Sequence, residues 1–405
     1  MTDTDPEDLL ERVREGEVRL HELEAHADAD VAATVRRRYV EDATGSDLST
    51  VGEYAFPAEA ADPNVENMIG AAQVPMGVVG PVDVDGGAAD GEYWLPMATT
   101  EGALLASVNR GLSAIRGAGG ATARVLKSKM TRAPVFRVAD VAESKAVVEW
   151  VREHEDALRE AAESTTSHGE LVEITPYVVG DNVYLRFGYD TKDAMGMNMA
   201  TIATEAACEV VTDETPADLV ALSGNLCTDK KPTAINAVEG RGRTVAADVL
   251  LPHEAVEARF HTTTAAIAEA NTRKNLVGSA KAGALGFNAQ AANVVAAAFL
   301  ATGQDAAQVV EGANTITTVE EREAGLYASV TLASLEVGTV GGGTKLPTQA
   351  EALDAVGVRG GGDPPGSNAD ALAEVIATAA LAGELSLLGA LAADHLASAH
   401  EELGR

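Results

Sequence analysis

The sequence predicts an α+β protein in which a large helix-rich domain carries an inserted ferredoxin-like (β-α-β-β-α-β) unit and follows an N-terminal helical arm. Strand and helix patterns over residues 133–222 alternate in the split β-α-β-β-α-β order. Helical core sequence stands before that unit and resumes after it, which indicates an insertion. We therefore expect a helical region over 1–69, a large domain over 70–132 and 223–405, and a small domain over 133–222.

The first part of the large domain begins with strands. Residues 1–69 alternate charged helical stretches with the loop "AFPAEAADPN". The turn-rich segment around residues 77–96 then has strand character. A helix is expected to begin near Thr100, because apolar residues recur at helical spacing after it; they are Leu104, Val108, Leu112 and Ile115.

The small domain is predicted element by element. "PVFRVADV" has the pattern of a strand, and "ESKAVVEWVREHEDALREAAEST" that of one amphipathic helix. "ELVEITPYVVGDNVYLRFGYD" predicts a hairpin with "GDN" at its turn. "MGMNMATIATEAACEVVTDE" predicts a second helix and "ADLVALSGN" a last strand.

The remaining sequence predicts alanine-rich helices, a strand pair ending in a glycine turn, and a final helix over about 368–403. The uncharged run 282–304 is long enough to span a membrane. It contains Asn288, Gln290 and Asn293, so we expect a buried helix there. Glu374 and Glu384 likewise interrupt the apolar C-terminal segment, and no membrane span is predicted.

Composition excludes several classes of protein. The net charge is −32, and acidic residues are dispersed rather than gathered in a tail. Such a surface is typical of adaptation to high salt and argues against nucleic-acid binding, which needs basic surfaces. Two cysteines give neither a disulfide framework nor a zinc site and fit a reducing cytoplasm. The acidic N-terminus lacks the apolar core of a signal peptide.

One pair of lysines is unusual. The chain has nine lysines, and Lys230 and Lys231 stand together behind Asp229 in "SGNLCTDKKPTAINAVEGRGR". The pair is either a solvated surface feature or a held point charge that stabilises a developing oxyanion. Elsewhere, Glu101 is expected in a first helical turn, where the helix dipole stabilises a carboxylate.

Other motifs remain open between structure and function. Asp305 ends the uncharged run as a solvated terminus or as a partner for a lysine. "DAMGMNM" is core or an approach to a flat ring, and "GTVGGGT" is a flexible turn or a backbone anion site. His395 and His400 are five residues apart and lie on different helical faces, so we predict no metal site.

Nine strings in order resemble class I 3-hydroxy-3-methylglutaryl-CoA (HMG-CoA) reductase, the eukaryotic and archaeal form. The resemblance covers about 65–400 and is carried by "ENMIGAAQVPMGVVGP", "TTEGALLASVNRG", "KMTRAPV", "DAMGMNM", "SGNLCTDKKPTAINAVEGRGR", "KNLVGSA", "TGQDAAQ", "GTVGGGT" and "GELSLLGALAADHLASAH". It implies a double reduction of HMG-CoA to mevalonate and CoA with NADPH, in isoprenoid biosynthesis.

The resemblance also implies residue roles. Lys230 would stabilise the carbonyl oxygen, and Asp305 would orient Lys230. Glu101 would protonate the oxygen of mevaldehyde, and His400 the leaving CoA thiolate. The family's site lies between subunits, with the lysine loop of one meeting the Glu and Asp of the other. A homodimer or a dimer of dimers is therefore expected.

Binding residues carry over from the same motifs. Those implied for the substrate are Ser107, Asn109, Arg110, Arg132, Ser223, Asp229, Lys231, Lys274 and Asn293. Those implied for NADPH are Asp193, Met195, Gly196, Met197, Asn198, Gly341, Gly342 and Gly343, with the small domain as the cofactor domain.

The sequence departs from the family in two places. Gln290 stands where many relatives have a histidine, and "STTSHGE" has no arginine for a cofactor 2′-phosphate. Two rival functions follow. One is an NAD-dependent reductase running in the mevalonate-degrading direction, and the other is a non-catalytic acyl-CoA or nucleotide-binding protein.

Overall fold

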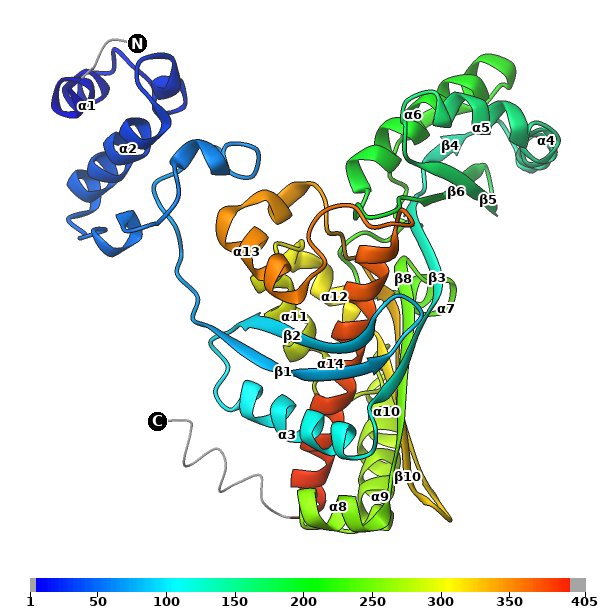
Figure 1. Ribbon diagram of the computed structural model, residues 1–405. Coiled ribbons are helices and arrows are strands. Elements are labelled where there is room, and N and C mark those ends of the chain that lie inside the picture. Colours follow the sequence, from blue (N-terminus) through cyan, green and yellow to red (C-terminus); the bar gives the residue numbers. More distant parts are fainter. Residues whose placement is uncertain (1–4, 394–405) are drawn as a thin grey trace.

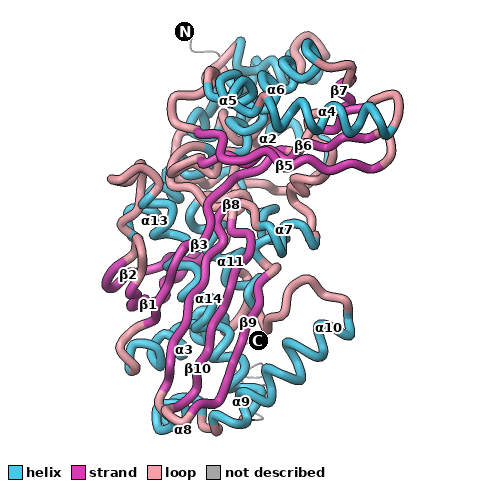
Figure 2. The backbone as a smooth tube through the Cα atoms, turned by 90° about the vertical axis from the view of Figure 1, so that its right-hand side faces the viewer, coloured by secondary structure: helices cyan, strands magenta, loops and turns pink. Residues whose placement is uncertain are grey.

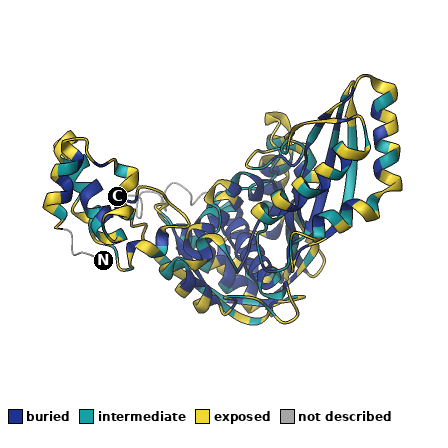
Figure 3. Ribbon diagram, turned by 90° about the horizontal axis from the view of Figure 1, so that it is seen from above, coloured by how far each residue is buried: buried dark blue, intermediate teal, exposed yellow. Residues whose placement is uncertain are grey.

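The computed structural model describes residues 5–393, and His395 and His400 therefore lie outside the described residues. Figure 1 shows three parts: N-terminal helices that stand away from the body, a long central body around α14, and a smaller unit of helices and strands at its upper end. Mixed helix and strand agree with the predicted α+β class. Buried residues concentrate in the central body, as the dark blue ribbon in Figure 3 shows.

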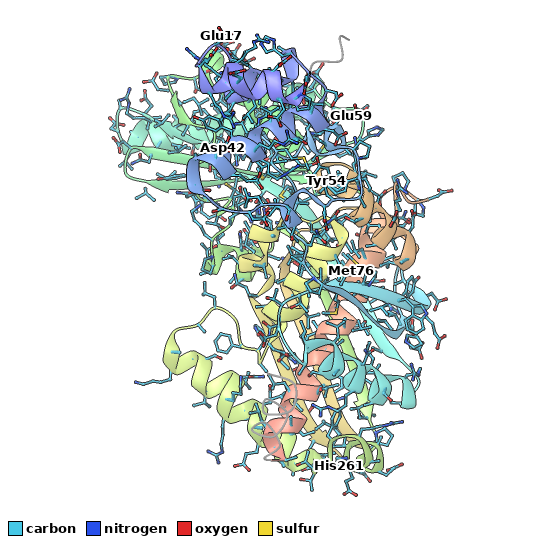
Figure 4. All side chains as sticks on the ribbon, turned by 90° about the vertical axis from the view of Figure 1, so that its left-hand side faces the viewer. Glu17, Asp42, Tyr54, Glu59, Met76 and His261 are labelled. Carbon is cyan, nitrogen blue, oxygen red and sulfur yellow. The ribbon has the colours of Figure 1, made fainter. Side chains whose placement is uncertain are left out.

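The N-terminal arm has its own small core. Asp5 and Asp28 cap its two α-helices by accepting backbone N–H groups, and Gly45 ends the second in the left-handed region. In Figure 4, Tyr54 and Met76 lie where the arm passes into the body. Its elements are α1 (Pro6–Arg14), η1 (Leu20–Ala25), α2 (Ala29–Thr44), η2 (Thr50–Gly52) and η3 (Ala58–Ala61).

The body is built on a twisted sheet. Strands pair in the order β2-β1-β3-β8-β10-β9, antiparallel except for a short parallel contact between β1 and β3. Burial alternates along β8 and β10, so one face of each packs on helices. The bounds are β1 (Met76–Asp85), β2 (Asp90–Ala98), β3 (Ala121–Arg132), β8 (Gly242–Leu251), β9 (Thr315–Arg322) and β10 (Gly325–Leu335).

Helices cover one face of this sheet. α14 contacts β3, β8 and β10, and Figure 2 shows it behind these long strands. The helices of the body are α3 (Leu104–Gly117), α7 (Ala234–Glu239), α8 (His253–Phe260), α9 (Thr264–Ala270), the π-helix η4 (Asn271–Gly278), α10 (Ser279–Ala282), α11 (Ala291–Thr302), η5 (Ala306–Gln308), α12 (Val309–Gly312), η6 (Gly342–Lys345), α13 (Pro347–Val356) and α14 (Ser367–Ala392).

α14 is long and apolar enough to cross a membrane by length and composition. However, 83% of its apolar window is buried inside the protein. Its two glutamates are buried and satisfied: Glu374 accepts from the backbone of Gly87 and Ala89, and Glu384 from that of Gln290. These features are those of a core helix.

The small unit forms a four-stranded antiparallel layer in the order β7-β4-β6-β5 under three helices. It has a separate hydrophobic core. The long strand β3 joins it to the body, since Lys129 pairs with β8 and the next residue, Met130, pairs with β6. The bounds are β4 (Val135–Arg137), α4 (Val141–Glu153), α5 (Glu155–Glu163), β5 (Glu170–Val179), β6 (Asn182–Asp190), α6 (Met197–Glu214) and β7 (Asp218–Ala221).

Two helix predictions need correction. The single helix predicted after β4 is broken into α4 and α5 at His154, whose ring stacks on Trp150 and whose Nδ1 lies 2.8 Å from the Trp150 carbonyl oxygen. The helix expected near Thr100 begins at Leu104, because Ala103 takes a left-handed conformation. Glu101 consequently lies in the preceding loop and outside the first helical turn.

Candidate functional site

A cleft of about 660 Å³ lies where the small unit meets the body. Segments far apart in the sequence form its walls, including the start of α6, the lysine loop and the loop after α11. It is lined by Pro63, Asn64, Ala194, Met195, Gly196, Met197, Asn198, Met199, Asp229, Lys230, Gly303, Gln304, Asp305, Gly338, Val340, Gly341, Gly342, Gly343 and Thr344.

The backbone of the lysine loop is strained. Asn225, Thr228 and Lys230 all have positive φ, at 61°, 48° and 60°. This conformation is uncommon for residues other than glycine and is retained where the surroundings enforce it. Here the buried Asn236 amide donates to the carbonyl oxygens of Cys227 and Thr228, at 3.3 Å each. The loop therefore presents Lys230 in one fixed direction.

Lys230 is paired with Asp305 in the cleft. The Lys230 Nζ lies 2.8 Å from Asp305 Oδ2, with side chains 45% and 30% exposed. The hydrogen bond that the Lys230 ammonium donates to Asp305 raises the pKa of that ammonium, so the group stays protonated at neutral pH. Both residues belong to one chain, so the expectation that the Lys–Asp pair is shared between subunits is wrong.

Buried side chains hold the Asp229 carboxylate in place. Arg241 Nη2 lies 3.1 Å from Asp229 Oδ1, and Gln308 Nε2 donates to the same oxygen at 2.8 Å. Arg241 is fully buried and also contacts the Glu311 and Glu336 carboxyl groups. Asp229 thus connects the cleft to a buried charge network.

Asp193 has a different environment from the other residues of its motif. It is buried, and its carboxylate accepts backbone N–H groups from Gly362, Gly366 and Ala369, at 2.9, 2.7 and 3.1 Å. Its carbonyl oxygen accepts from Thr339. Asp193 therefore caps α14 and ties the start of that helix to both walls of the cleft, and it is not among the lining residues.

We expect Asp193→Ala to lower the free energy of unfolding by about 2–4 kcal/mol, because three backbone donors, two of them buried, lose their acceptor. Urea unfolding at fixed KCl measures the change. Asp354→Ala is the control, since Asp354 pairs with Arg359 on the surface and its loss is worth under about 0.5 kcal/mol. Equal effects of the two substitutions would contradict the capping role.

Glycines shape two walls of the cleft. Gly196 has φ 85°, and a Cβ there would lie 2.3 Å from Thr191 Cγ2. Gly341 and Gly342 have positive φ and open space on the side of a Cβ. Gln304 fixes this second turn, because its side chain donates to the Gly338 carbonyl and accepts the Gly338 N–H. Both walls leave backbone accessible to a ligand.

A second polar cluster lies between α3, α14 and the start of α11. Arg110 donates to Ser386 through Nε at 2.9 Å and through Nη2 to the carbonyl at 3.1 Å. The Ser107 and Ser386 hydroxyls are 2.9 Å apart, and Gln290 Nε2 donates to Ser107. Arg110 thus has neutral partners here, and burial lowers the pKa of its guanidinium.

The other predicted residues are dispersed. Asn109 accepts the Gly80 N–H, Lys231 donates to the Asp229 carbonyl, and the Ser223 hydroxyl contacts Cys227 Sγ. Lys274 donates to Asn275 in the π-helix, a type of turn enriched at functional sites. Asn293 is half-buried on α11.

Glu101 and Arg132 stand apart from the Lys230 cleft of their own chain. Glu101 is exposed, and neither residue lines that cleft. The buried Arg132 Nε has no hydrogen-bond partner within residues 5–393. In the same range, no group of three His, Cys, Asp or Glu side chains is placed to hold a metal ion.

Sequence reasoning did not single out five residues that build the site: Gln304, Gln308, Arg241, Glu311 and Glu336. Arg241, Gln304 and Gln308 lie within the sequence motifs that indicate the site, but their partners are distant in the chain. A weak signal was present for Arg241, since an arginine between two glycines directly follows the lysine loop.

The fold is shared with solved reductase structures. The chain aligns with the class II 3-hydroxy-3-methylglutaryl-CoA reductase from Streptococcus pneumoniae bound to NADPH in open conformations, with a TM-score of 0.66, 21% identity, and coverage of 96% of this chain and 98% of that chain. A second structure of the enzyme from this organism gives a TM-score of 0.66 at 20% identity, covering 96% and 86% of the two chains.

The family model for hydroxymethylglutaryl-coenzyme A reductase matches residues 32–405, and the chain belongs to this family. The 3-hydroxy-3-methylglutaryl-coenzyme A reductase of Haloferax volcanii is 73% identical, covering 99% of this chain and 100% of the relative. That of Halobacterium salinarum is 72% identical, with 99% of each covered, and that of Pyrococcus abyssi is 53% identical, covering 98% and 99%.

Proposed function

We propose that the protein is a class I HMG-CoA reductase that reduces (S)-HMG-CoA to (R)-mevalonate and CoA with two NADPH, in the mevalonate route to isoprenoid lipids. The observation that carries the proposal is the Lys230–Asp305 pair, held on a strained loop inside a cleft with two glycine-shaped walls. Relatives at 72–73% identity over the whole chain carry the reductase name.

The cleft fits a dinucleotide. The start of α6 and the 341–343 turn offer backbone unshielded by side chains, as phosphates and a flat ring require. Met195, Gly196, Met197, Asn198, Gly341, Gly342 and Gly343 would hold it. NADPH, when bound, supplies hydride in two successive steps.

The protein's own groups manage charge and protons. The Lys230 ammonium, which stays charged, would stabilise the negative charge that develops on the carbonyl oxygen. Asp305 would hold that ammonium in the required orientation. Glu101 would give a proton to the oxygen of mevaldehyde, and His400 would protonate the CoA thiolate after the carbon–sulfur bond breaks. Ser107, Arg110 and Lys274 would bind the substrate from the α3–α14 side.

Separate hydrophobic cores support a division into domains. The small unit over 133–222 would be the NADP-binding domain, and its β7-β4-β6-β5 order is that of a ferredoxin-like fold. The body over 70–132 and 223–405 would bind HMG-CoA, behind a helical region over 1–69. The acidic chain would work in a salt-rich cytoplasm, as its similarity to proteins of Haloferax and Halobacterium suggests.

We further propose a homodimer or dimer of dimers with sites at the subunit interface. Glu101 does not line the Lys230 cleft of its own chain, so a second copy would have to supply it.

A cofactor assay in molar KCl tests the function. Purified protein with HMG-CoA and NADPH should lose absorbance at 340 nm, with two cofactors oxidised per CoA released. Parallel reactions with NADH, and with mevalonate, CoA and NAD, examine the rival that runs in the mevalonate-degrading direction. Faster turnover by that rival, or none in any direction and salt, would overturn the proposal.

A further inference from the structure

Beneath the lysine loop lies a buried cluster of one cation and several acids. Arg241 Nη1 is 3.1 Å from Glu311 Oε2 and 3.3 Å from Glu336 Oε1, and Arg241 Nη2 is 3.1 Å from Asp229. Arg241, Glu311 and Glu336 are all 0% exposed. One guanidinium therefore faces three carboxyl groups, two of them fully buried.

This arrangement cannot hold three negative charges at low free energy. Desolvation penalises each buried ion, and two carboxylates on one guanidinium also repel each other. Lys230 does not relieve the excess, because its ammonium is already paired with Asp305. One proton bound by the Glu311–Glu336 pair removes one charge.

The hydrogen bonds show which carboxyl is ionised. Both carboxylate oxygens of Glu311 accept hydrogen bonds from Arg241, and one of them also accepts from Asn236 Nδ2 at 2.7 Å. Within the described part of the chain, Glu336 accepts a hydrogen bond only from Arg241, at 3.3 Å, and its Oε2 has no hydrogen-bond partner. Charge is favoured at Glu311, and the proton at Glu336.

The ionised Glu311 reaches the catalytic loop by two routes. The Asn236 amide nitrogen donates to the Glu311 carboxylate and also to the carbonyl oxygens of Cys227 and Thr228. Arg241 links Glu311 to Asp229, the residue before Lys230. These contacts hold the positive-φ conformation at Thr228 and Lys230.

We propose that Glu311 and Glu336 hold one proton between them, and that the ionised Glu311 is a positioning residue for Lys230. The positioning role rests on the proposed reductase function. The sharing of the proton does not, since it follows from burial and charge alone.

The proton gives stability a defined pH dependence. Burial first, and then the charge of Glu311, raise the pKa of Glu336 well above 4.5. The folded state then binds more protons than the unfolded state, so the contribution of Glu336 to stability is complete below pH 4.5. It is lost as the pH rises toward the folded pKa. The charged groups that act directly on the pair are Arg241 and Asp229. Cys227 and Arg186 face Arg241 in turn, and Glu239 faces Arg186.

Thermal unfolding of Glu336→Gln and wild-type protein between pH 5 and 8, at fixed KCl, tests the shared proton. The amide imitates the neutral carboxyl and cannot ionise. Its Tm relative to wild type should therefore rise by roughly 3 °C or more across this range. A relative Tm that stays flat or falls would overturn the shared proton.

Glu374→Gln is the matched control. Glu374 is also a buried glutamate, but its carboxylate accepts backbone N–H groups of residues 87–89 and does not touch the lysine loop. Its substitution should lower Tm without any relative gain as the pH rises. A gain equal to that of Glu336→Gln would show a general effect of removing a buried acid and overturn the assignment.

Glu311→Gln tests the positioning role. We expect kcat to fall by about 30-fold or more while KM for HMG-CoA and NADPH stays within about 3-fold, since Lys230 acts in the transition state. Glu311→Asp, which keeps the charge, should recover part of kcat and decides the matter if the glutamine variant does not fold. An unchanged kcat with lowered Tm would leave Glu311 merely structural. If wild-type protein does not turn over, the function fails, while the Tm series still decides the proton.

Discussion

Replacing Lys230 with alanine should lower kcat by about 1,000-fold or more while the protein remains folded. The Lys230 ammonium carries a positive charge into the cleft, and Asp305 Oδ2, 2.8 Å away, orients it. In the proposed mechanism, its removal takes away the charge that stabilises the developing oxyanion, and such losses are large in other enzymes. The HMG-CoA and NADPH assay measures kcat, and circular dichroism verifies the fold.

Lys145→Ala serves as the control for this substitution. Lys145 is exposed on α4, where it pairs only with Glu149 four residues on. Its loss should change kcat by less than about 2-fold, because a surface ion pair contributes little. If Lys230→Ala keeps more than a tenth of wild-type kcat, Lys230 is not the group that stabilises the developing oxyanion.

Local patterns were sufficient for much of the fold. The hairpin around "GDN" was predicted, and β5 and β6 meet there with only Gly180 and Asp181 between them. The period-2 and period-3.6 patterns lie within each segment, so the sequence displays them directly. The start of α3 was misplaced because it depends on the backbone conformation of one residue, Ala103, which no periodicity reports.

The site was predictable only where a motif contains the functional residue itself. Lys230 and Asp305 belong to two separate motifs, and the resemblance to a family supplied their pairing. Arg241 was missed because its acidic partners come from positions 229, 311 and 336, which no local spacing connects. Asp193 was expected at the cofactor, although its carboxylate is already occupied by the start of α14.

The predicted catalytic residues divide into two groups within one chain. Lys230 and Asp305 share the cleft at the small unit, whereas Glu101 lies in the loop before α3. α3 packs on α14, where Arg110 and Ser107 gather around Ser386. A single reaction needs both groups within contact distance of one substrate. In an isologous dimer, each chain would contribute Lys230 and Asp305 to one site and Glu101 to the other, which satisfies this requirement twice.

Complementation between two inactive variants tests this exchange. On their own, Lys230→Ala should reduce kcat by about 1,000-fold or more and Glu101→Gln by about 100-fold or more. In a co-expressed mixture, half of the dimers contain one chain of each kind, and each of these has one intact site of two. Activity should therefore return to about a quarter of wild type. Separately purified variants mixed under conditions that prevent subunit exchange are the control and should stay inactive. Recovery in the co-expressed sample alone requires Lys230 and Glu101 to act from different chains, whereas a co-expressed sample as inactive as its parents would place both residues in one subunit's site and remove the basis for an interfacial active site.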